Sequence, residues 1–510
     1  MAVPATEPAL QSTPAQRIAT SRTAPWLLTP IVLFVHGYHP FAGDAGIYTA
    51  GVQHLLDSSL YSLNSAFVDA FTRRSMFAWT VAELARITHA PLGWILLPLH
   101  LCSVALFLIA CERLARRFFA RDSARRCAVL LAAACCSLPV AGTALVLMDP
   151  YVTARSFSTP LSLLAVASCL DREWLRTALL LALATLLHPL MGCYAIAFVL
   201  LLALVVAGRI RSAVAVCAAG LALAGVAFAM AHRFREPAAY REAIDLPQRT
   251  FLFLGRWHWY ELLGLVLPLA LYGVGLLRLP RNGSMRAVCV TAILLGTSSI
   301  AIAALFVPAG GPWLLVPLQP LRAFHILYAV GVVLCGGILG KLFQRQRLLA
   351  TASALILFAA MAFAEHVSWP ECNRIEWPGV QPENAYQQAF LWIRSHTRRD
   401  VVFAFDPQFV YWPGEDEQGF RSLTERDHLA DDKDAGLVAV IPSLAVRWAE
   451  QRRATASINS MSDAQRRASL APFGVSWILL PGSATTGLLC PFRNAAVQVC
   501  ALSPPGSPHS

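Results

Sequence analysis

The pair Gly43–Asp44 is the part of this chain best suited to chemistry. It follows the first apolar segment, within the run His-Gly-Tyr-His-Pro-Phe-Ala-Gly-Asp-Ala-Gly-Ile-Tyr of residues 36–48. A carboxylate at such a place can face water and lipid headgroups together, and it can accept the proton of an attacking hydroxyl group. Asp is also among the residues preferred at a helix start. Two roles are therefore open for Asp44, general base and helix cap, and one side chain can fill both.

A second candidate group is Arg155 with Asp149, in the segment Asp-Pro-Tyr-Val-Thr-Ala-Arg between two apolar runs. An arginine near the membrane interface is suited to bind a phosphate. The same arginine can form an ion pair with Asp149 that only holds the loop. We keep both interpretations and count both residues among the substrate-binding candidates.

Five arginines lie in the segment 232–260, next to a cluster of aromatic residues. The arginines are Arg233, Arg235, Arg241, Arg249 and Arg256, and the cluster is Trp257, His258, Trp259 and Tyr260. Arginines on an external loop run against the positive-inside preference, so local negative charge must compensate them. Lipid phosphate can do so, and so can the acids Glu236, Glu242, Asp245 and Glu261. Arg256 and His258 are the substrate-binding candidates here, with an interfacial aromatic belt as the alternative for the cluster.

Two histidines complete the candidate site. His188 precedes Pro189 where two short helices meet, and broken helices can line a cavity. The alternative is that His188 satisfies carbonyls that the proline leaves unpaired. His39 lies close enough to Asp44 to orient it or to bind substrate, whereas His100 and His325 fall inside apolar spans and are interpreted as packing residues. No spacing predicts a metal site, and no glycine-rich loop predicts a soluble nucleotide donor.

Composition and charge show what must position these residues. The chain has 510 residues, of which 56% are hydrophobic and only 14% charged, as in multi-pass membrane proteins. Residues 1–366 hold 28 basic and 15 acidic residues, and only Lys341 and Lys433 in the whole chain are lysines. This excess fits lipid headgroups and membrane topology, and nothing resembles a nucleic-acid-binding motif.

The positive-inside rule predicts about eleven spans, with the N-terminus cytoplasmic and the C-terminus outside. Residues 1–24 are expected to be a disordered cytoplasmic tail, 25–366 the transmembrane domain with an external loop at 39–90, and 367–510 a soluble periplasmic α/β domain. The arginine-rich segment 113–126 gives the strongest orientation signal. Spans with readable bounds are about 26–38, 91–111, 127–148, 212–231, 287–307 and 348–364, and the run 174–207 is expected to break at His188. The segment 45–56 is predicted to be a helix on the membrane surface.

The C-terminal domain shows a helix over 384–396 and strands over 401–405, 477–480 and 495–502. Its charged middle, 421–434, is interpreted as a solvated face rather than a ligand site. If the domain is external, Cys490 and Cys500 can form a disulfide between neighbouring strands. The cysteines of the apolar part are expected to behave as small hydrophobic residues.

This layout resembles the C-class integral membrane glycosyltransferases, which take sugars from polyprenyl-phosphate carriers. The resemblance rests on the short first span, the acidic residue that opens the first external loop, the span number and the external C-terminal domain. It is also similar to a group of uncharacterised bacterial multi-pass proteins with related Gly-Asp, His-Pro and Glu-Arg…Ala-Asp segments. Many glycosyltransferases of this class carry a second carboxylate where this chain has Ala45, and this difference argues against a metal-assisted variant. A divalent metal is still the one cofactor that the resemblance leaves open.

The resemblance implies sugar transfer from a polyprenyl-phosphate-linked sugar to an acceptor lipid, glycan or protein on the periplasmic face of a bacterial inner membrane. Asp44 would be the general base. A transporter or a scaffold for surface-polysaccharide assembly is the alternative. A transporter would place paired ionisable residues at mid-membrane, and a scaffold would need neither Asp44 nor Arg155.

Overall fold

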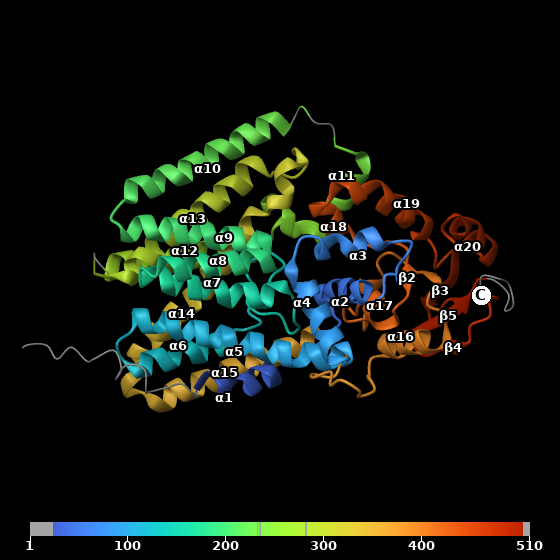
Figure 1. The fold of residues 1–510 in the computed structure, drawn as a ribbon, viewed down its shortest axis with the longest axis horizontal. Helices are drawn as coiled ribbons and strands as arrows, with labels where there is room; N and C mark the ends of the chain where they lie inside the picture. Colours follow the sequence, from blue (N-terminus) through green and yellow to red (C-terminus); the bar gives the residue numbers. More distant parts are fainter. Residues whose placement is uncertain (1–23, 232, 234–235, 281–282, 503–510) are drawn as a thin grey trace, which may run out of the picture.

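The computed structural model describes residues 24–231, 233, 236–280 and 283–502. The tail expected at 1–24 lies outside these residues, apart from Ala24. Figure 1 shows long helices gathered at one end of the molecule and the strands at the other, with the helices of the loop 39–90 between them. The candidate residues are therefore positioned where three parts of the chain meet.

Eleven helices occupy the regions where spans are predicted, within the described part of the chain. They are α1 (Ala24–His36), α5 (Leu92–Phe118), α6 (Asp122–Ala134), α7 (Ala154–Leu170), α8 (Trp174–Leu187), α9 (Pro189–Val206), α10 (Ile210–Ala231), α12 (Trp259–Arg278), α13 (Ser284–Phe306), α14 (Phe324–Leu342) and α15 (Arg347–Ser368). Seven of the segments described are long and apolar enough to cross a membrane: α5, α9, α10, α12, α13, α14 with its flanking turns, and α15. The other four have 13 to 17 residues. The chain is thus a multi-pass membrane protein. Seven of its described segments, rather than the predicted eleven, qualify as membrane spans by length and composition.

Close packing inside the membrane part depends on small residues. A Cβ atom on Gly336 of α14 would lie 2.7 Å from the Ala128 Cα of α6, and one on Gly340 would lie 2.7 Å from the Cys127 Cβ. Glycines four residues apart form one face of a helix, and they let two backbones approach closely without a hydrophobic driving force. The buried core of this region extends from these helices to α5, α7, α9 and α13.

The span predicted at 127–148 is wrong in its second half. Helix α6 ends at Ala134, and the chain then folds into an irregular hairpin with an antiparallel bridge between Pro139 and Val146. Pro139 has no amide hydrogen for a helical bond, and a Cβ on Gly142 would lie 2.7 Å from the Trp257 ring. This irregular segment leads directly to Asp149.

The loop 39–90 forms α2 (Gly43–Leu56), α3 (Ser65–Thr72) and α4 (Met76–Thr88). The helix is confirmed for 45–56, but its surface location is wrong, because most of α2 is buried in protein. A Cβ on Gly46 would lie 2.9 Å from the Gly419 Cα, so the small residues of α2 let the C-terminal domain pack against it. Between the later spans lie α11 (Ala238–Ile244) and the 3-10 helices η1 (Pro247–Leu252), η2 (Leu254–Arg256), η3 (Trp313–Leu318) and η4 (Pro320–Ala323).

The C-terminal part contains a five-stranded mixed sheet of order β2-β1-β3-β5-β4. Its strands are β1 (Val402–Ala404), β2 (Asp427–His428), β3 (Val475–Pro481), β4 (Phe492–Arg493) and β5 (Val497–Ala501), and its helices are α16 (Ala385–His396), α17 (Phe420–Thr424), α18 (Ala435–Val440), α19 (Ala445–Thr455) and α20 (Asp463–Leu470). Strands β2, β1 and β3 are parallel, and β5 is antiparallel to β3 and β4. The predicted helix and all three predicted strands are confirmed. Short 3-10 turns η5 (Phe343–Arg345), η6 (Phe409–Tyr411), η7 (Pro442–Leu444) and η8 (Ala471–Phe473) complete the elements.

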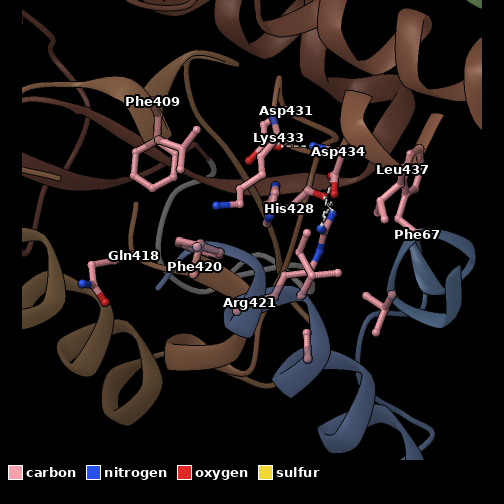
Figure 2. A pocket seen from close by; sticks show the side chains of 17 residues that line it. Phe67, Phe409, Gln418, Phe420, Arg421, His428, Asp431, Lys433, Asp434 and Leu437 are labelled. Atoms are coloured by element: carbon pink, nitrogen blue, oxygen red, sulfur yellow. Dashed lines mark hydrogen bonds and ion pairs between the residues drawn. The ribbon is translucent and has the colours of Figure 1, made fainter. Parts of the chain in front are cut away.

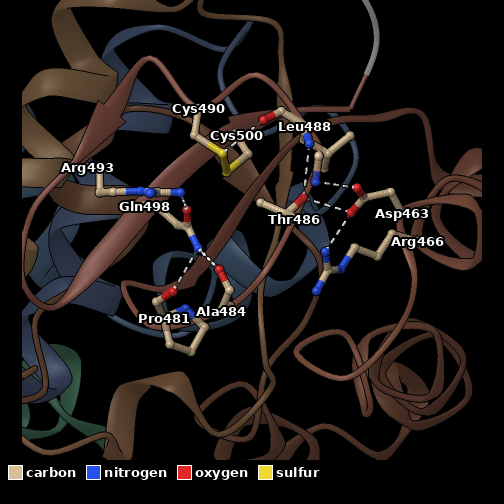
Figure 3. Close-up of a disulfide and its surroundings, with 11 residues drawn as sticks. Asp463, Arg466, Pro481, Ala484, Thr486, Leu488, Cys490, Arg493, Gln498 and Cys500 are labelled. Carbon is tan, nitrogen blue, oxygen red and sulfur yellow. Dashed lines mark hydrogen bonds and ion pairs between the residues drawn. A yellow bond between two sulfur atoms is a disulfide. The ribbon is translucent and has the colours of Figure 1, made fainter.

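The disulfide between Cys490 and Cys500 is present and joins β5 to the loop before β4 (Figure 3). The interpretation of 421–434 as a solvated face is wrong. Arg421, Asp427 and Asp434 are all buried, and Arg421 pairs with both acids at 3.4 and 3.1 Å. These charges tolerate burial because each one meets an opposite charge.

Candidate active site

A cavity of about 610 Å³ lies between the membrane helices, the loop 39–90 and the C-terminal domain. This volume is in the range of sites that bind small molecules or cofactors. Its polar lining includes Asp44, Asp149, Tyr151, Arg155, His188, Gln248, Arg249, Gln319, Arg322, Glu417 and Lys433. These residues come from distant parts of the sequence, so the cavity depends on the packing of all three parts.

Asp44 is held at this cavity by the residue before it. Gly43 has φ +55°, a conformation that favours glycine, and its N–H donates to the Glu417 carbonyl at 2.9 Å. A Cβ at position 43 would lie 2.5 Å from the Tyr151 hydroxyl oxygen. Ala42 is the N-cap residue of α2, and no side chain caps it. The capping role is therefore not filled by Asp44, which lies in the first helical turn.

Several cations keep Asp44 charged. Its Oδ2 lies 3.8 Å from the Arg155 Nη1, and 48% of its side chain is exposed, on the side that lines the cavity. Burial alone would raise the pKa of Asp44, but Arg155, followed by Lys433, Arg322 and Arg249, lowers it below the usual value. A carboxylate in this state can accept a hydrogen bond from a neutral hydroxyl group.

Arg155 forms the ion pair with Asp149, the first of the two interactions that the sequence leaves open, while phosphate binding stays a prediction. Its Nη2 donates to the Asp149 Oδ1 at 2.7 Å and its Nε donates to the Oδ2 at 3.2 Å, which makes a fork-shaped pair. Both side chains are almost fully buried. The third nitrogen, Nη1, faces Asp44. Asp149 therefore fixes the orientation of a guanidinium group that contributes positive charge to the cavity.

Three further arginines, Arg74, Arg249 and Arg322, line the cavity without a carboxylate partner among the residues that the structure describes. Arg249 in η1 donates to the backbone carbonyls of Asp432 and Lys433. Arg322 in η4 lies over the Phe251 ring at 5.5 Å, and its buried Nε has no acceptor within the described part of the chain. Their charge is thus available to an anionic ligand.

Lys433 also lines this cavity. It lies on a turn with the buried acids Asp431 and Asp434, which Figure 2 shows in a neighbouring pocket that Lys433 lines as well. The backbone N–H groups of Lys433 and Asp434 both donate to the Asp431 Oδ1 at 2.9 Å. The Lys433 Nζ is 3.0 Å from the Glu417 Oε2. Burial would lower the pKa of Lys433, but Glu417 and Asp44 raise it above the usual value, so the amine is charged.

The structure brings together four of the residues proposed from the sequence: Asp44, Asp149, Arg155 and His188. His188 is the N-cap residue of α9, where its Nδ1 accepts from the Met191 N–H at 3.4 Å. It therefore satisfies an amide of the following helix, whereas the carbonyl of Leu187 accepts from Ser75.

Three proposed residues do not line the cavity. His39 is fully buried between Glu376, at 2.9 Å from its Nδ1, and Glu365, at 3.4 Å from its Nε2. Arg256 pairs with Asp245 at 2.6 Å. At this position the charge of the arginine is therefore compensated by an acid of the same segment. His258 starts α12, where its N–H donates to Glu261 at 2.7 Å.

One other arginine of the segment 232–260 and one of its acids form ion pairs. Arg241 pairs with Glu236, and Glu242 pairs with Arg453 at 2.8 Å. Arg235 lies outside the described residues. Of the aromatic cluster, Trp257 is buried while Trp259 and Tyr260 are exposed.

Arg322, Lys433 and Glu417 were missed from the sequence. Lys433 had a signal of its own, because it is one of only two lysines in the chain. Arg322 follows Pro320 at the outer end of an apolar run, where the positive-inside rule does not expect an arginine. Glu417 gave no signal in the pattern of its neighbours.

The cavity carboxylates do not form a metal site. Asp149 is bound by Arg155, Glu417 by Lys433, and Glu365 by Arg374 at 2.7 Å. Asp44 alone offers too few oxygen ligands for a hard cation such as Mg²⁺, which prefers an octahedral set. Positive charge in the cavity comes from the side chains themselves.

Neither a family model nor a curated protein matches the chain. Among solved structures, an archaeal oligosaccharyltransferase, AglB from Archaeoglobus fulgidus, in complex with an inhibitory peptide and a dolichol-phosphate is similar over 90% of this chain and 69% of that chain, at 10% identity and a TM-score of 0.48. The Archaeoglobus fulgidus oligosaccharyltransferase in complex with Zn and sulfate is similar over 90% and 67% of the two chains, at 10% identity and a TM-score of 0.48. These neighbours are GT-C-type membrane glycosyltransferases. They belong to the class that the sequence layout resembles.

Proposed function

We propose that the chain is a membrane glycosyltransferase that moves a sugar from a polyprenyl-phosphate carrier to an acceptor lipid, glycan or protein on the periplasmic face of a bacterial inner membrane. One observation carries the proposal: an ionised carboxylate, Asp44, shares a cavity with arginines that have no acid partner within the described residues, among them Arg249 and Arg322. Catalysis of sugar transfer from a lipid phosphate needs a base for the acceptor and cations for the leaving group.

In the proposed reaction, the acceptor oxygen forms a bond to the anomeric carbon while the bond from that carbon to the carrier phosphate oxygen breaks. The acceptor proton passes to the Asp44 carboxylate. The electron pair of the broken bond stays on the phosphate, which gains negative charge. Arg322 and Arg249 stabilise that charge, with Arg155 and Lys433 adding to the positive field.

The exposed apolar helices support a membrane-bound carrier. Helices α10 and α12 expose leucine and valine side chains such as Leu223, Val226, Leu267 and Leu271. The arginine-rich segment 113–126 covers the C-terminal end of α5 and the start of α6. Arg117 of this segment pairs with Asp171, next to the C-terminal end of α7, whereas Arg155 lies at the N-terminal end of α7, on the cavity. The positive-inside rule then assigns the cavity to the external face, with the N-terminus cytoplasmic and the C-terminal domain periplasmic.

Binding of the carrier phosphate tests the site directly. The detergent-purified full-length chain is titrated with a polyprenyl phosphate and with the uncharged polyprenol of the same length. We expect the phosphate to bind at least about tenfold more tightly, because two charge-assisted contacts are each worth about 1.5–3 kcal/mol before costs.

The double variant Arg249→Gln/Arg322→Gln should lose this preference. Arg278→Gln, an exposed arginine at the end of α12, is the matched control and should retain it. Equal affinity for phosphate and alcohol in the wild-type protein would contradict the proposal. It would leave the scaffold or transporter alternative in its place.

A further inference from the structure

A second polar cluster lies outside the cavity, where the chain leaves the membrane for the C-terminal domain. The His39, Cys372 and Glu376 side chains each present one ligand atom, and these atoms lie within 4.8 Å of one another. His39 is fully buried, and the other two are largely shielded from solvent. None of the three lines the cavity that holds Asp44.

The surroundings of the cluster resemble the outer shell of a metal site. The second ring nitrogen of His39, Nε2, lies 3.4 Å from Glu365, which is itself paired with Arg374 at 2.7 Å. Gln387 donates to the Glu376 Oε2 at 2.9 Å. A ligating histidine almost always donates its other N–H to a carboxylate or carbonyl, and ligating carboxylates are hydrogen-bonded in turn.

The cysteine also accepts hydrogen bonds as a thiolate ligand would. The Gln418 Nε2 lies 3.3 Å from the Cys372 Sγ, and the Asn384 Nδ2 lies 3.7 Å from it. A thiolate accepts hydrogen bonds better than a thiol does, and the Asn384 amide can keep donating to the sulfur when the sulfur binds a metal.

The Gln418 side chain can supply a fourth ligand atom. Its Nε2 is 3.4 Å from the Glu376 Oε1, and its Oε1 is buried without a partner among the residues described. A half-turn of the amide exchanges these two atoms and points an oxygen at the cluster. Ligand atoms around a tetrahedral Zn²⁺ lie about 3.3–3.7 Å apart, given bonds of about 2.0–2.3 Å, so the two separations from Gln418 fit this geometry.

We propose that His39, Cys372 and Glu376 bind one Zn²⁺, with the Gln418 amide oxygen as the fourth ligand. A nitrogen, a thiolate and a carboxylate suit Zn²⁺ better than Mg²⁺ or Ca²⁺, which prefer oxygen. Binding releases two protons to solvent, one from the thiol and one from the hydrogen bond between the His39 Nδ1 and Glu376, which the ion replaces. All four positions are filled by protein, so the ion is structural.

The location of the cluster indicates a structural role for the ion. The Glu376 N–H donates to the Tyr38 carbonyl at 3.0 Å, and the Tyr38 N–H donates to the Arg374 carbonyl at 2.9 Å, so the two segments already run side by side. His39 precedes Asp44 by five residues in the same loop. Zinc would therefore fasten the loop of Asp44 to the start of the C-terminal domain.

The test uses the full-length protein in detergent, freed of metal and then given one equivalent of Zn²⁺ or Co²⁺. We expect about one bound ion per chain and a Co²⁺ spectrum with a thiolate charge-transfer band. Cys372→Ser should lose the band and bind the ion at least tenfold more weakly. Cys193→Ser, which removes an exposed cysteine, is the control and should behave as the wild type.

A measurement on the wild-type chain keeps the proposal testable if Cys372→Ser does not fold. Zn²⁺ should slow the alkylation of Cys372 at least tenfold while leaving that of Cys193 unchanged. Equal alkylation rates of Cys372 with and without Zn²⁺, or a Co²⁺ spectrum without a thiolate band, would overturn the proposal. Neither result bears on sugar transfer, because the cluster lies outside the cavity.

Discussion

Asp44 keeps its charge because cations outweigh burial around it, and this determines how the activity should depend on pH. A lowered pKa means that the carboxylate is present at all pH values above that pKa and is lost only as the pH falls through it. The acid limb of the rate of sugar transfer should thus lie below about pH 3.9, the usual value for Asp.

Replacing Lys433 should move that limb. Lys433→Gln removes one of the charges that lower the pKa of Asp44, so the limb should shift to higher pH even though the maximum rate also falls. Lys341→Gln, at the other lysine of the chain, is the control and should leave the limb in place. The pH dependence of kcat/KM measures both, and identical acid limbs in wild type and Lys433→Gln would contradict this electrostatic account.

At the scale of elements, the start of α2 positions the carboxylate. Gly43→Ala places a methyl group against Tyr151 in a left-handed backbone conformation, which costs about 1–3 kcal/mol if the conformation is kept. We expect the turn to shift and sugar transfer to fall at least tenfold, while the protein still inserts into the membrane. Gly220→Ala in α10, where a Cβ meets nothing within 4 Å, should leave transfer unchanged. Parallel measurements of transfer and membrane yield distinguish the two, and full activity of Gly43→Ala would show that the turn does not set the site.

Elements with strong local signals were predicted well. Asn384 caps α16 through hydrogen bonds to the Tyr386 and Gln387 amides, and the apolar face of the helix follows the helical period. The predicted strands are apolar segments buried in the sheet. The span at 127–148 failed because hydropathy does not register that Pro139 ends helical hydrogen bonding. The segment 421–434 failed because its acids and Arg421 neutralise one another, which only the tertiary structure shows.

The candidate site was predictable only in part for the same reason. Asp44, Asp149 and Arg155 stand out because ionisable residues are rare beside apolar runs. Arg322 and Lys433 reach the same cavity only because segments far apart in the sequence pack together. No local sequence pattern predicts such contacts. His39 was misplaced because closeness in sequence to Asp44 does not fix the direction of a side chain.

At the scale of the molecule, the cavity depends on a shared core between loops and C-terminal domain. Phe67 of α3, Tyr240 of α11 and Trp448 of α19 are all buried in one cluster. The C-terminal domain thus forms one wall of the cavity. A loss of stability in this domain should therefore affect the site only when the whole domain unfolds.

The disulfide gives a measurement of that stability. Cys490 and Cys500 close a loop over a sequence separation of 10 residues (Figure 3). Nearby, the Thr486 hydroxyl donates a hydrogen bond to the Asp463 Oδ1 at 2.7 Å. Chain-entropy arguments give such a crosslink about 2–3 kcal/mol. Cys490→Ser/Cys500→Ser should therefore shift the urea midpoint for proteolysis of the C-terminal domain to lower urea.

Reductant should produce the same shift in the wild-type protein, whereas Cys102→Ser/Cys193→Ser, which removes two exposed cysteines, should produce none. Sugar transfer in the absence of urea should persist in the disulfide variant. An unchanged midpoint would mean that the crosslink does not stabilise the domain.

Replacement of Asp44 by its neutral isostere tests the central claim most directly. Asp44→Asn and Asp57→Asn, the latter at the C-terminal end of the same helix, are each introduced into a strain that lacks the gene. Glycans on lipid, wall polymer and protein are then compared by mass spectrometry at matched protein levels. We predict that Asp44→Asn lowers the modification about 10²- to 10⁴-fold, the usual contribution of a general base, while Asp57→Asn restores it fully. A glycan profile from Asp44→Asn identical to that of the wild type would remove Asp44 from the mechanism and contradict the account.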